Sequence, residues 1–280
     1  MKVYPFKIPK KENERLIVQV DKEPIFYNRL HQHDEIQISH ILNGNGKLLV
    51  GDSIHQFAKG DIYIIGGNLP HLFRSTPGEK DAHMVSIFFT EEMFGKDFFT
   101  IPDVQEIMTF FNQAKNGFKV IAQEQKVIKH LLLVGAQKNI QRFISFLQLL
   151  DLLNNVEKKT LTKFISPKSL TLNEGERLQV IFDHIFKNFQ KAIQLSEIAE
   201  MAYMTPTAFC RFFKQRTNKT FFQFLIELRV EHACQLLGSE QEYKINEVSE
   251  LCGFNSVSNF NRKFKSIKGQ TPTAYKKAIV

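Results

Sequence analysis

Cysteine is scarce and long apolar runs are absent in this chain of 280 residues, and each of these two features excludes a class of protein. There is no tryptophan, and Cys210, Cys234 and Cys252 form no CxxC pair. A disulfide framework or a cysteine zinc site is therefore not expected. No apolar run approaches the roughly 20 residues that span a bilayer, and residues 1–5 lack the apolar core of a signal peptide. These features predict a cytoplasmic protein without membrane partners.

Neither sign of charge is in large excess over the whole chain. With 37 basic and 29 acidic residues, the net charge is +8. Local charge is more informative, because residues 201–226 contain four basic residues and no acidic one, and residues 256–277 contain six basic residues and no acidic one. Two basic segments without acids suit a polyanion such as nucleic acid.

The same two segments belong to a sequence repeat. Residues 198–204 align with residues 248–254, and residues 205–214 align with residues 256–265 after one extra residue in the second turn. The aligned pairs include Glu200 with Glu250, Phe209 with Phe260, Arg211 with Arg262, Phe213 with Phe264, and Lys214 with Lys265. A repeat at this separation indicates one supersecondary unit that is used twice.

Each copy predicts a short helix, a tight turn and a second helix. Thr205 and Ser256 are the expected N-caps of the second helices, and Pro206 suits the first helical position. Asn218 and Gly269 are expected to end these helices in the left-handed conformation. The apolar residues expected to face inward are Phe209, Phe212 and Phe213 in the first copy, and Phe260, Phe264 and Ile267 in the second. This is the layout of a helix-turn-helix; an ordinary pair of helical hairpins is the alternative.

These motifs resemble the DNA-binding domain of AraC/XylS-type transcription regulators. The resemblance covers residues 177–277 and rests on residues 198–199, 209–214, 253–256, 260–265 and 269–272. Asn218 stands where the family usually has glycine, and Ser249 where it usually has alanine. The resemblance implies a regulator that binds double-stranded DNA, with RNA polymerase as a further partner when it acts as an activator.

The second helix of each copy carries the candidate DNA contacts. Arginine can pair with guanine and asparagine with adenine, so base contacts are expected from Thr207, Cys210, Arg211, Ser258, Asn261 and Arg262. Phosphate contacts are expected from Lys214, Arg216, Lys219, Lys265 and Lys268. A stiff helix over about residues 220–237 would let the two copies enter successive major grooves about 34 Å apart. Alternatively, Arg211 and Arg262 brace the fold through Glu200 or Glu250.

The first hundred residues have a different pattern. Short strand candidates at residues 16–20, 24–27, 35–42, 47–50, 54–57, 62–65 and 84–89 are separated by glycine and aspartate. This spacing predicts a small antiparallel barrel or jelly roll. Residues 31–33, the turn at residues 44–46 and residues 59–61 and 69–71 resemble the cupin-like sensor domain that often precedes the DNA-binding part of these regulators. The resemblance implies a small-molecule effector, with sugars as a candidate class.

Histidines and polar residues mark the candidate effector pocket. On a strand, His31, His33, Glu35 and Gln37 would share one face, and His71 would join them from a neighbouring strand. They are expected to line the pocket; a metal site and a merely surface location are the alternatives. Metal-binding cupins usually have glutamate where this chain has Gln37, so no metal or cofactor is predicted. The rival function is a cupin-type metalloenzyme, but the sequence offers no arrangement for a nucleophile.

Residues 103–155 show helical periodicity with wide apolar stripes. These helices are expected either to cover the barrel or to pair two subunits as a homodimer. In the regulators that this chain resembles such helices commonly pair two subunits, so the resemblance implies a homodimer. The predicted fold class is therefore α+β, a cupin or jelly-roll β-barrel with a helical extension and an all-α domain with two helix-turn-helix motifs. The predicted parts are residues 1–100 (effector-sensing barrel), 101–155 (helical dimerisation segment), 156–173 (linker) and 174–280 (tandem helix-turn-helix domain).

Overall fold

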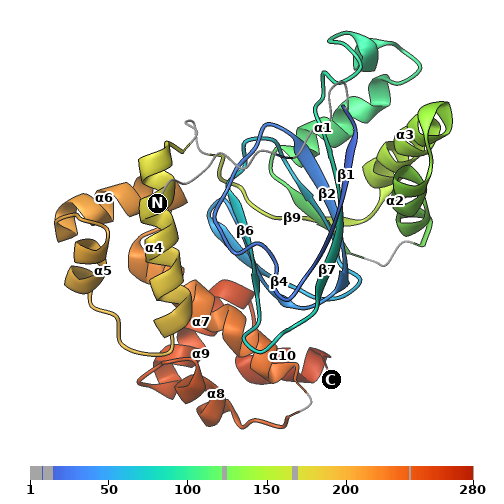
Figure 1. Cartoon of the computed structure of the whole chain (residues 1–280). Coiled ribbons are helices and arrows are strands. Elements are labelled where there is room, and N and C mark those ends of the chain that lie inside the picture. Colours follow the sequence, from blue (N-terminus) through green and yellow to red (C-terminus); the bar gives the residue numbers. More distant parts are fainter. Residues whose placement is uncertain (1–7, 9–14, 122–124, 166–169, 240, 280) are drawn as a thin grey trace. The chain divides into compact units, whose positions relative to one another are not determined.

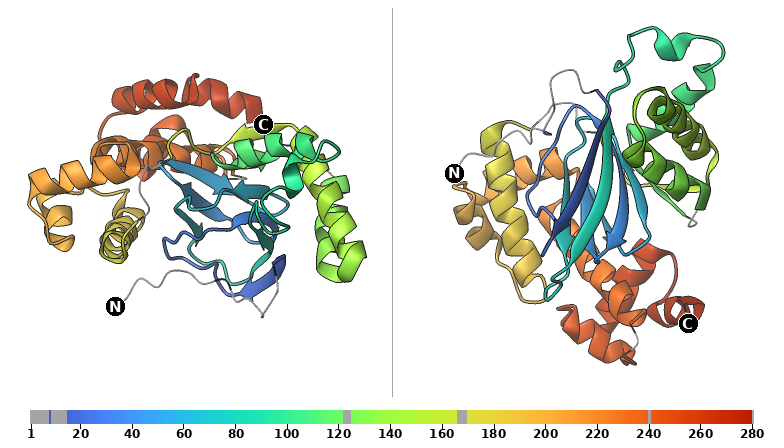
Figure 2. Two further views of the ribbon diagram at one scale, coloured as in Figure 1. Left: turned by 90° about the horizontal axis from the view of Figure 1, so that it is seen from above. Right: turned by 45° about the vertical axis from the view of Figure 1, so that its right-hand side comes forward.

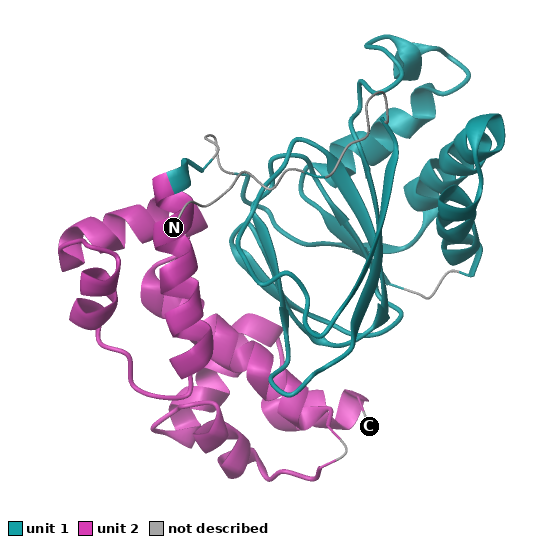
Figure 3. Cartoon of the chain, in the orientation of Figure 1, with its two compact units in different colours: residues 1–172 teal, residues 173–280 magenta. Residues whose placement is uncertain are grey.

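The chain consists of two compact units, residues 1–172 and residues 173–280, which Figure 3 shows in different colours. The computed structural model describes residue 8 and residues 15–121, 125–165, 170–239 and 241–279. The boundaries predicted from the sequence at residues 100 and 155 both lie within the first of these units. Of the expected linker, Ser166, Pro167 and Ser169 lie outside the described residues, as do residues 1–5.

The first unit contains two antiparallel sheets. The larger has the strand order β1-β7-β2-β5-β8-β9, and the smaller has the order β4-β3-β6. The strands are β1 (Ile17–Glu23), β2 (Ile36–Asn43), β3 (Gly46–Val50), β4 (Ser53–Phe57), β5 (Ile62–Ile65), β6 (His71–Ser75), β7 (Ala82–Phe89), β8 (Phe118–Val120) and β9 (Lys158–Thr160). Buried residues from both sheets form one cluster, including Leu48, Phe57, Tyr63, Phe73 and Met84. The two sheets therefore pack face to face as a β-sandwich, which confirms the α+β class with an N-terminal cupin-like unit.

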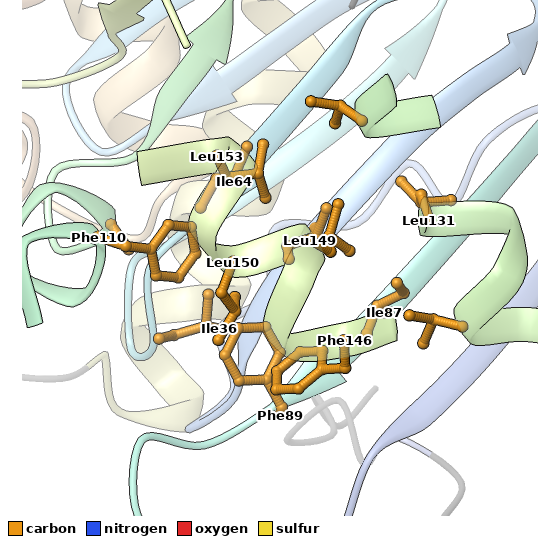
Figure 4. Packing of buried hydrophobic residues seen from close by; sticks show 14 of the residues in the cluster. Ile36, Ile64, Ile87, Phe89, Phe110, Leu131, Phe146, Leu149, Leu150 and Leu153 are labelled. Carbon is orange, nitrogen blue, oxygen red and sulfur yellow. The ribbon is translucent and has the colours of Figure 1, made fainter. Parts of the chain in front are cut away.

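Successive side chains of each strand point to opposite faces of the larger sheet, and both faces are buried. In β2, Ile41 belongs to the cluster between the sheets, whereas Ile38 belongs to a second cluster with the helices. The helices are α1 (Met108–Ala114), α2 (Gln125–Ala136) and α3 (Asn139–Asn155), preceded by short 3₁₀ turns at Phe98–Thr100 and Gln105–Ile107. Figure 2 shows α2 and α3 against the outer face of this sheet. Figure 4 shows how Phe146, Leu149 and Leu150 of α3 pack there with sheet residues such as Ile87 and Phe89.

The helical segment and part of the expected linker are thus integral to the sandwich. Strand β8 follows α1 and pairs with β5, and β9 follows α3 and pairs with β8. Leu161 and Thr162, directly after β9, are buried. β8 and β9 were not predicted, because strands of three residues are too short to show alternation. Residues 24–27 were predicted as a strand but form a loop, where Pro24 has no N–H to donate to a sheet.

The second unit is entirely helical (Figure 1). Its helices are α4 (Leu172–Asn188), α5 (Leu195–Met201), α6 (Pro206–Thr217), α7 (Phe221–Leu237), α8 (Ile245–Leu251), α9 (Val257–Lys268) and α10 (Pro272–Ile279). In the part of the chain that the structure describes, no helix combines the length and the apolar character needed to cross a bilayer.

The predicted ends of α6 and α9 are confirmed. The Thr205 side chain accepts a hydrogen bond from the Ala208 N–H at 3.3 Å, and Ser256 caps α9 in the same way. Asn218 and Gly269 end α6 and α9 with φ values of 54° and 76°. The expectation that Ile267 faces inward is wrong, because its side chain is 37% exposed near the end of α9, beyond the packing of Phe264.

Helix α7 carries the two helix-turn-helix copies at opposite ends. A capping box formed by Thr220 and Gln223 fixes its start. Its first turns pack on α6 through Phe221 and Phe224, whose ring centroids lie 6.0 and 5.6 Å from that of Phe213. Residues 230–237 contribute to a separate cluster with α8 and α9, which includes Val230, Cys234, Val248, Phe260 and Phe264. One helix therefore holds both copies within a single unit.

Candidate nucleic-acid interface and histidine cluster

The outward faces of α6 and α9 carry most of the residues that the sequence singled out. In α6, Thr207, Cys210, Arg211 and Lys214 are exposed; in α9, Ser258, Arg262 and Lys265 are exposed. In each helix the buried phenylalanines lie on one side and the polar residues on the other. This separation produces the two polar faces. The faces bear positive charge and have no acidic residue in the helices themselves.

The two equivalent arginines are not engaged with the glutamates proposed to brace them. The Arg262 guanidinium donates to Asn259 Oδ1 at 2.9 Å within α9. Among the described residues, neither Arg211 nor Arg262 forms an ion pair with Glu200 or Glu250. Both guanidinium groups therefore remain available on the surface.

Asn261 is placed differently from its neighbours on α9. It is half-buried, and its Oδ1 is enclosed without a hydrogen-bond partner among the described residues. An unsatisfied buried oxygen is costly. A contact between this amide and an adenine therefore requires a change of side-chain rotamer.

Three of the five expected phosphate contacts lie in ion pairs within the second unit. Arg216 pairs with Glu174, the Lys219 Nζ lies 2.6 Å from Glu227 Oε2, and the Lys268 Nζ lies 2.5 Å from Glu231 Oε1. Burial is the largest single influence on the pKa of Lys268 and lowers it, but Glu231, Cys234 and Glu227 together outweigh burial and raise this pKa above its usual value. These cations tie the ends of α6 and α9 to α4 and α7, which leaves Lys214 and Lys265 as the exposed lysines. Sequence spacing gave no signal for partners so far along the chain.

One exposed residue next to α6 was not among the DNA contacts predicted from the sequence. Tyr203 lies in the turn between α5 and α6 with φ 55° and a side chain that is 91% exposed. Its counterpart in the second copy is Gly253, with φ 79°. A bulky residue in the left-handed region is uncommon and is often retained for function. The alignment of tyrosine with glycine was the available signal.

In the first unit, three histidines converge. One ring nitrogen from each of His31, His33 and His71 lies within 4.8 Å of the others. The hydrogen-bond partners of their Nδ1 atoms are the backbone oxygens of Arg29 at 2.7 Å, Glu35 at 2.9 Å and Leu69 at 2.9 Å, respectively. Because a carbonyl only accepts, each Nδ1 carries the proton and each Nε2 has a lone pair.

Burial keeps these imidazoles neutral. It lowers the pKa of His31 to about 4, against the smaller effect of the Arg29 carbonyl. Burial, together with the neighbouring His31 and His33, places the pKa of His71 well below its usual value. The cluster therefore has no charge of its own near neutral pH.

Gln37 joins the histidines from β2. Its Oε1 lies 3.2 Å from His33 Nε2 and 3.1 Å from His71 Nε2. Its Nε2 donates to Ser39 Oγ at 2.8 Å, and Ser39 Oγ lies 2.8 Å from Ser86 Oγ. One ring nitrogen of each histidine and the Gln37 amide oxygen thus lie close together, and donors of these types suit a late divalent transition ion. From the sequence, His71 was expected to join the other two histidines and Gln37, but no metal was predicted because of Gln37.

Glu35 is not part of the converging set. It is buried, and its Oε2 lies 3.8 Å from His33 Nδ1, the nitrogen that faces away from the cluster. Strand β2 begins only at Ile36, so His31, His33 and Glu35 belong to the preceding loop. They do not share a strand face with Gln37, and the loop brings the histidines together instead.

A pocket of about 470 Å³ lies beside this cluster. Its walls include Asp21, Phe26, His31, Gln37, Met84 and Phe88. Of the five residues expected to line a pocket, His31 and Gln37 do so, whereas His33, Glu35 and His71 are buried outside its walls. Apolar rings with a few convergent polar groups are typical of small-molecule sites.

Comparison with known proteins matches each unit separately. Residues 198–278 match the family described as "Helix-turn-helix domain", and residues 18–88 match "Cupin domain". The chain is 25% identical over 245 residues to the probable transcriptional regulator LumQ of Photobacterium leiognathi, covering 88% of this chain and 90% of that protein. It is 23% identical over 274 residues to the transcriptional activator RhaR of Escherichia coli K12, covering 94% and 92%. With a cupin domain followed by a DNA-binding helix-turn-helix domain, the chain belongs to the AraC family of transcription regulators, which are not enzymes.

Proposed function

We propose that the protein reads a specific DNA sequence with α6 and α9 together, acting in the cytoplasm. The observation that carries this proposal is the pair of exposed, basic helix faces held by one helix, α7. Base contacts are assigned to Thr207, Cys210, Arg211, Ser258 and Arg262, and to Asn261 after a rotamer change. Phosphate contacts are assigned to Lys214 and Lys265, with Arg216, Lys219 and Lys268 supporting the helices from their ion pairs.

The pocket supports control by a small molecule. It combines carboxylate, amide and imidazole groups with the rings of Phe26 and Phe88. Such a mixture suits a compact polar ligand that also has an apolar face, and a sugar has these properties. A ligand regulates DNA binding only if its affinity differs between two states of the protein.

The effector proposal predicts a ligand-dependent change in DNA affinity. At least one sugar is expected to raise the thermal unfolding temperature and to change the affinity for the operator by about 5- to 150-fold, the usual range of allosteric coupling. The measurement is a DNA titration with and without each sugar. If no metabolite changes either quantity, the first unit serves only in assembly.

An exposed apolar face on α2 and α3 supports a homodimer. Leu132, Ile140 and Ile144 are 47%, 61% and 41% exposed, although the opposite faces of the same helices are buried on the sheet. An apolar face of this kind is characteristic of protein–protein contacts. We propose that it pairs with the same face of a second copy, because a two-fold contact is self-complementary.

Charge on this face should separate the subunits. Ile144→Glu is expected to convert a dimer into a monomer, because it would bury an unpaired carboxylate at the contact. Gln141→Glu, at an exposed polar position on the same helix, is the matched control and should leave the dimer intact. Sedimentation velocity measures both. A wild-type monomer, or an Ile144→Glu protein as dimeric as the control, would contradict this arrangement.

Activation of transcription is the proposed outcome of binding. Relatives named RhaR are described as transcriptional activators. By this likeness, RNA polymerase is the proposed protein partner, and transcription from the bound promoter is expected to rise.

A further inference from the structure

The turn between the two helices has the same backbone structure in both helix-turn-helix copies. In the first copy, the N–H groups of Tyr203 and Met204 donate to carbonyl oxygens of α5 at 2.8 and 2.9 Å. In the second copy, those of Gly253 and Phe254 donate to carbonyl oxygens of α8 at 2.8 and 3.0 Å. This pair of hydrogen bonds ends a helix at one residue in the left-handed conformation, and that residue is usually glycine. Tyr203 therefore occupies a position where the backbone favours glycine.

The two turns differ in their surroundings. A Cβ atom at Gly253 would lie 2.4 Å from the backbone oxygen of Gln190, so no side chain fits there. The Tyr203 side chain is 91% exposed, and no hydrogen bond or ring contact joins it to another residue that the structure describes. The left-handed conformation costs a tyrosine free energy, and no contact among the described residues offsets that cost. A contact outside the chain would offset it.

The position of Tyr203 next to α6 indicates which contact this is. Tyr203 lies two residues before Thr205, the N-cap of α6. In a helix-turn-helix bound to DNA, the start of the second helix contacts base edges while the first helix crosses the sugar–phosphate backbone. The turn between them therefore lies where the backbone borders the major groove. Residues 201–226 contain no acidic side chain, and a phenolic hydroxyl can donate to a phosphate oxygen.

We propose that Tyr203 is a DNA-backbone contact of the first copy alone, with its hydroxyl donating to a phosphate beside the groove that α6 enters. This proposal rests on the reading of DNA by α6 and α9 together. It adds that the two half-sites are held unequally, because Gly253 has no side chain to make the equivalent contact. The extra contact would help to fix which half-site the first copy occupies, while base contacts supply the sequence preference.

Two variants of Tyr203 in the full-length protein test this proposal on an operator selected from random DNA. Tyr203→Phe removes only the hydroxyl and is expected to weaken operator binding about tenfold. Tyr203→Gly should weaken binding at least as much, yet it should raise the thermal unfolding temperature, because glycine adopts the left-handed conformation at little cost. Tyr243→Phe is the control: this hydroxyl already donates to Gln241 Oε1 at 2.7 Å, and its removal should leave DNA binding unchanged.

Salt dependence distinguishes a hydroxyl contact from a charged one. Lys214→Ala is expected to reduce the slope of log affinity against log salt concentration by about one, because it removes a charge that displaces a counterion. Tyr203→Phe should weaken binding without changing this slope. In footprinting, the loss should be confined to the patch protected by the first copy.

Three outcomes would overturn the proposal. The first is a Tyr203→Gly protein that binds the operator as tightly as wild type. The second is weaker binding by Tyr203→Gly together with a lower unfolding temperature, which would indicate a structural role. The third is wild-type affinity in Tyr203→Phe, which would remove the hydrogen bond. A wild-type protein that selects no operator would instead refute reading by α6 and α9, on which the contact depends.

Discussion

Replacing Arg211 and Arg262 together by alanine is expected to weaken binding to the operator by about 2–6 kcal/mol, since each bidentate arginine–base contact contributes about 1–3 kcal/mol. Both side chains are exposed at equivalent positions of α6 and α9. The loss should fall on the specific site, with preference relaxed at one base position for each arginine. Competition titrations against unrelated DNA measure affinity and specificity together.

Lysine replacements at the same two positions provide the control. Arg211→Lys with Arg262→Lys keeps both charges but removes the planar fork that pairs with guanine. This variant should retain nonspecific affinity and its salt dependence while losing specificity. If the alanine and lysine variants lose affinity equally on every sequence tested, the arginines do not read bases.

Truncation of Phe213 should have the largest effect on stability. Its ring is fully buried, and its centroid lies within 6.2 Å of the centroids of Phe182, Phe209, Phe221 and Phe224. Phe213→Ala is expected to lower the free energy of unfolding of the second unit by about 3–5 kcal/mol, because it creates a cavity between α4, α6 and α7. Hydrogen exchange of the amides in α6 and α7 measures this loss in the intact chain.

The neighbouring Phe222 is the matched control for that experiment. Its side chain is 51% exposed on α7, so Phe222→Ala should cost much less stability than Phe213→Ala. Equal protection of α6 and α7 in wild type and Phe213→Ala would show that these aromatic rings do not form the core that supports α6.

Much of the second unit was predictable because local chemistry and a repeat both specify it. Thr205, Ser256 and Gly269 have the side chains that the helix ends require, and the aligned phenylalanines mark the buried faces. The ion pair of Arg216 with Glu174 was not predictable, because it joins residues of two different helices through tertiary packing. Charge alone therefore overstated the number of cations free to bind phosphate.

The first unit was predictable in its strands but less so in its site. Alternation and turn residues located most strands of the sandwich, and His71 lies on a neighbouring strand as expected, but His31 and His33 were assigned to a strand face that they do not occupy. Their convergence depends on the loop before β2, whose path is set by the backbone bonds between His31 and His71. Such long-range pairing has no local sequence signal.

Footprinting of the protein on an operator selected from random DNA tests the central claim most directly. If α6 and α9 act as a tandem, each chain should protect two patches on one face of the duplex, centred about one helical turn, or about 34 Å, apart. Arg211→Ala should weaken one patch and Arg262→Ala the other. A single protected patch per chain, or protection without sequence preference, would contradict the account.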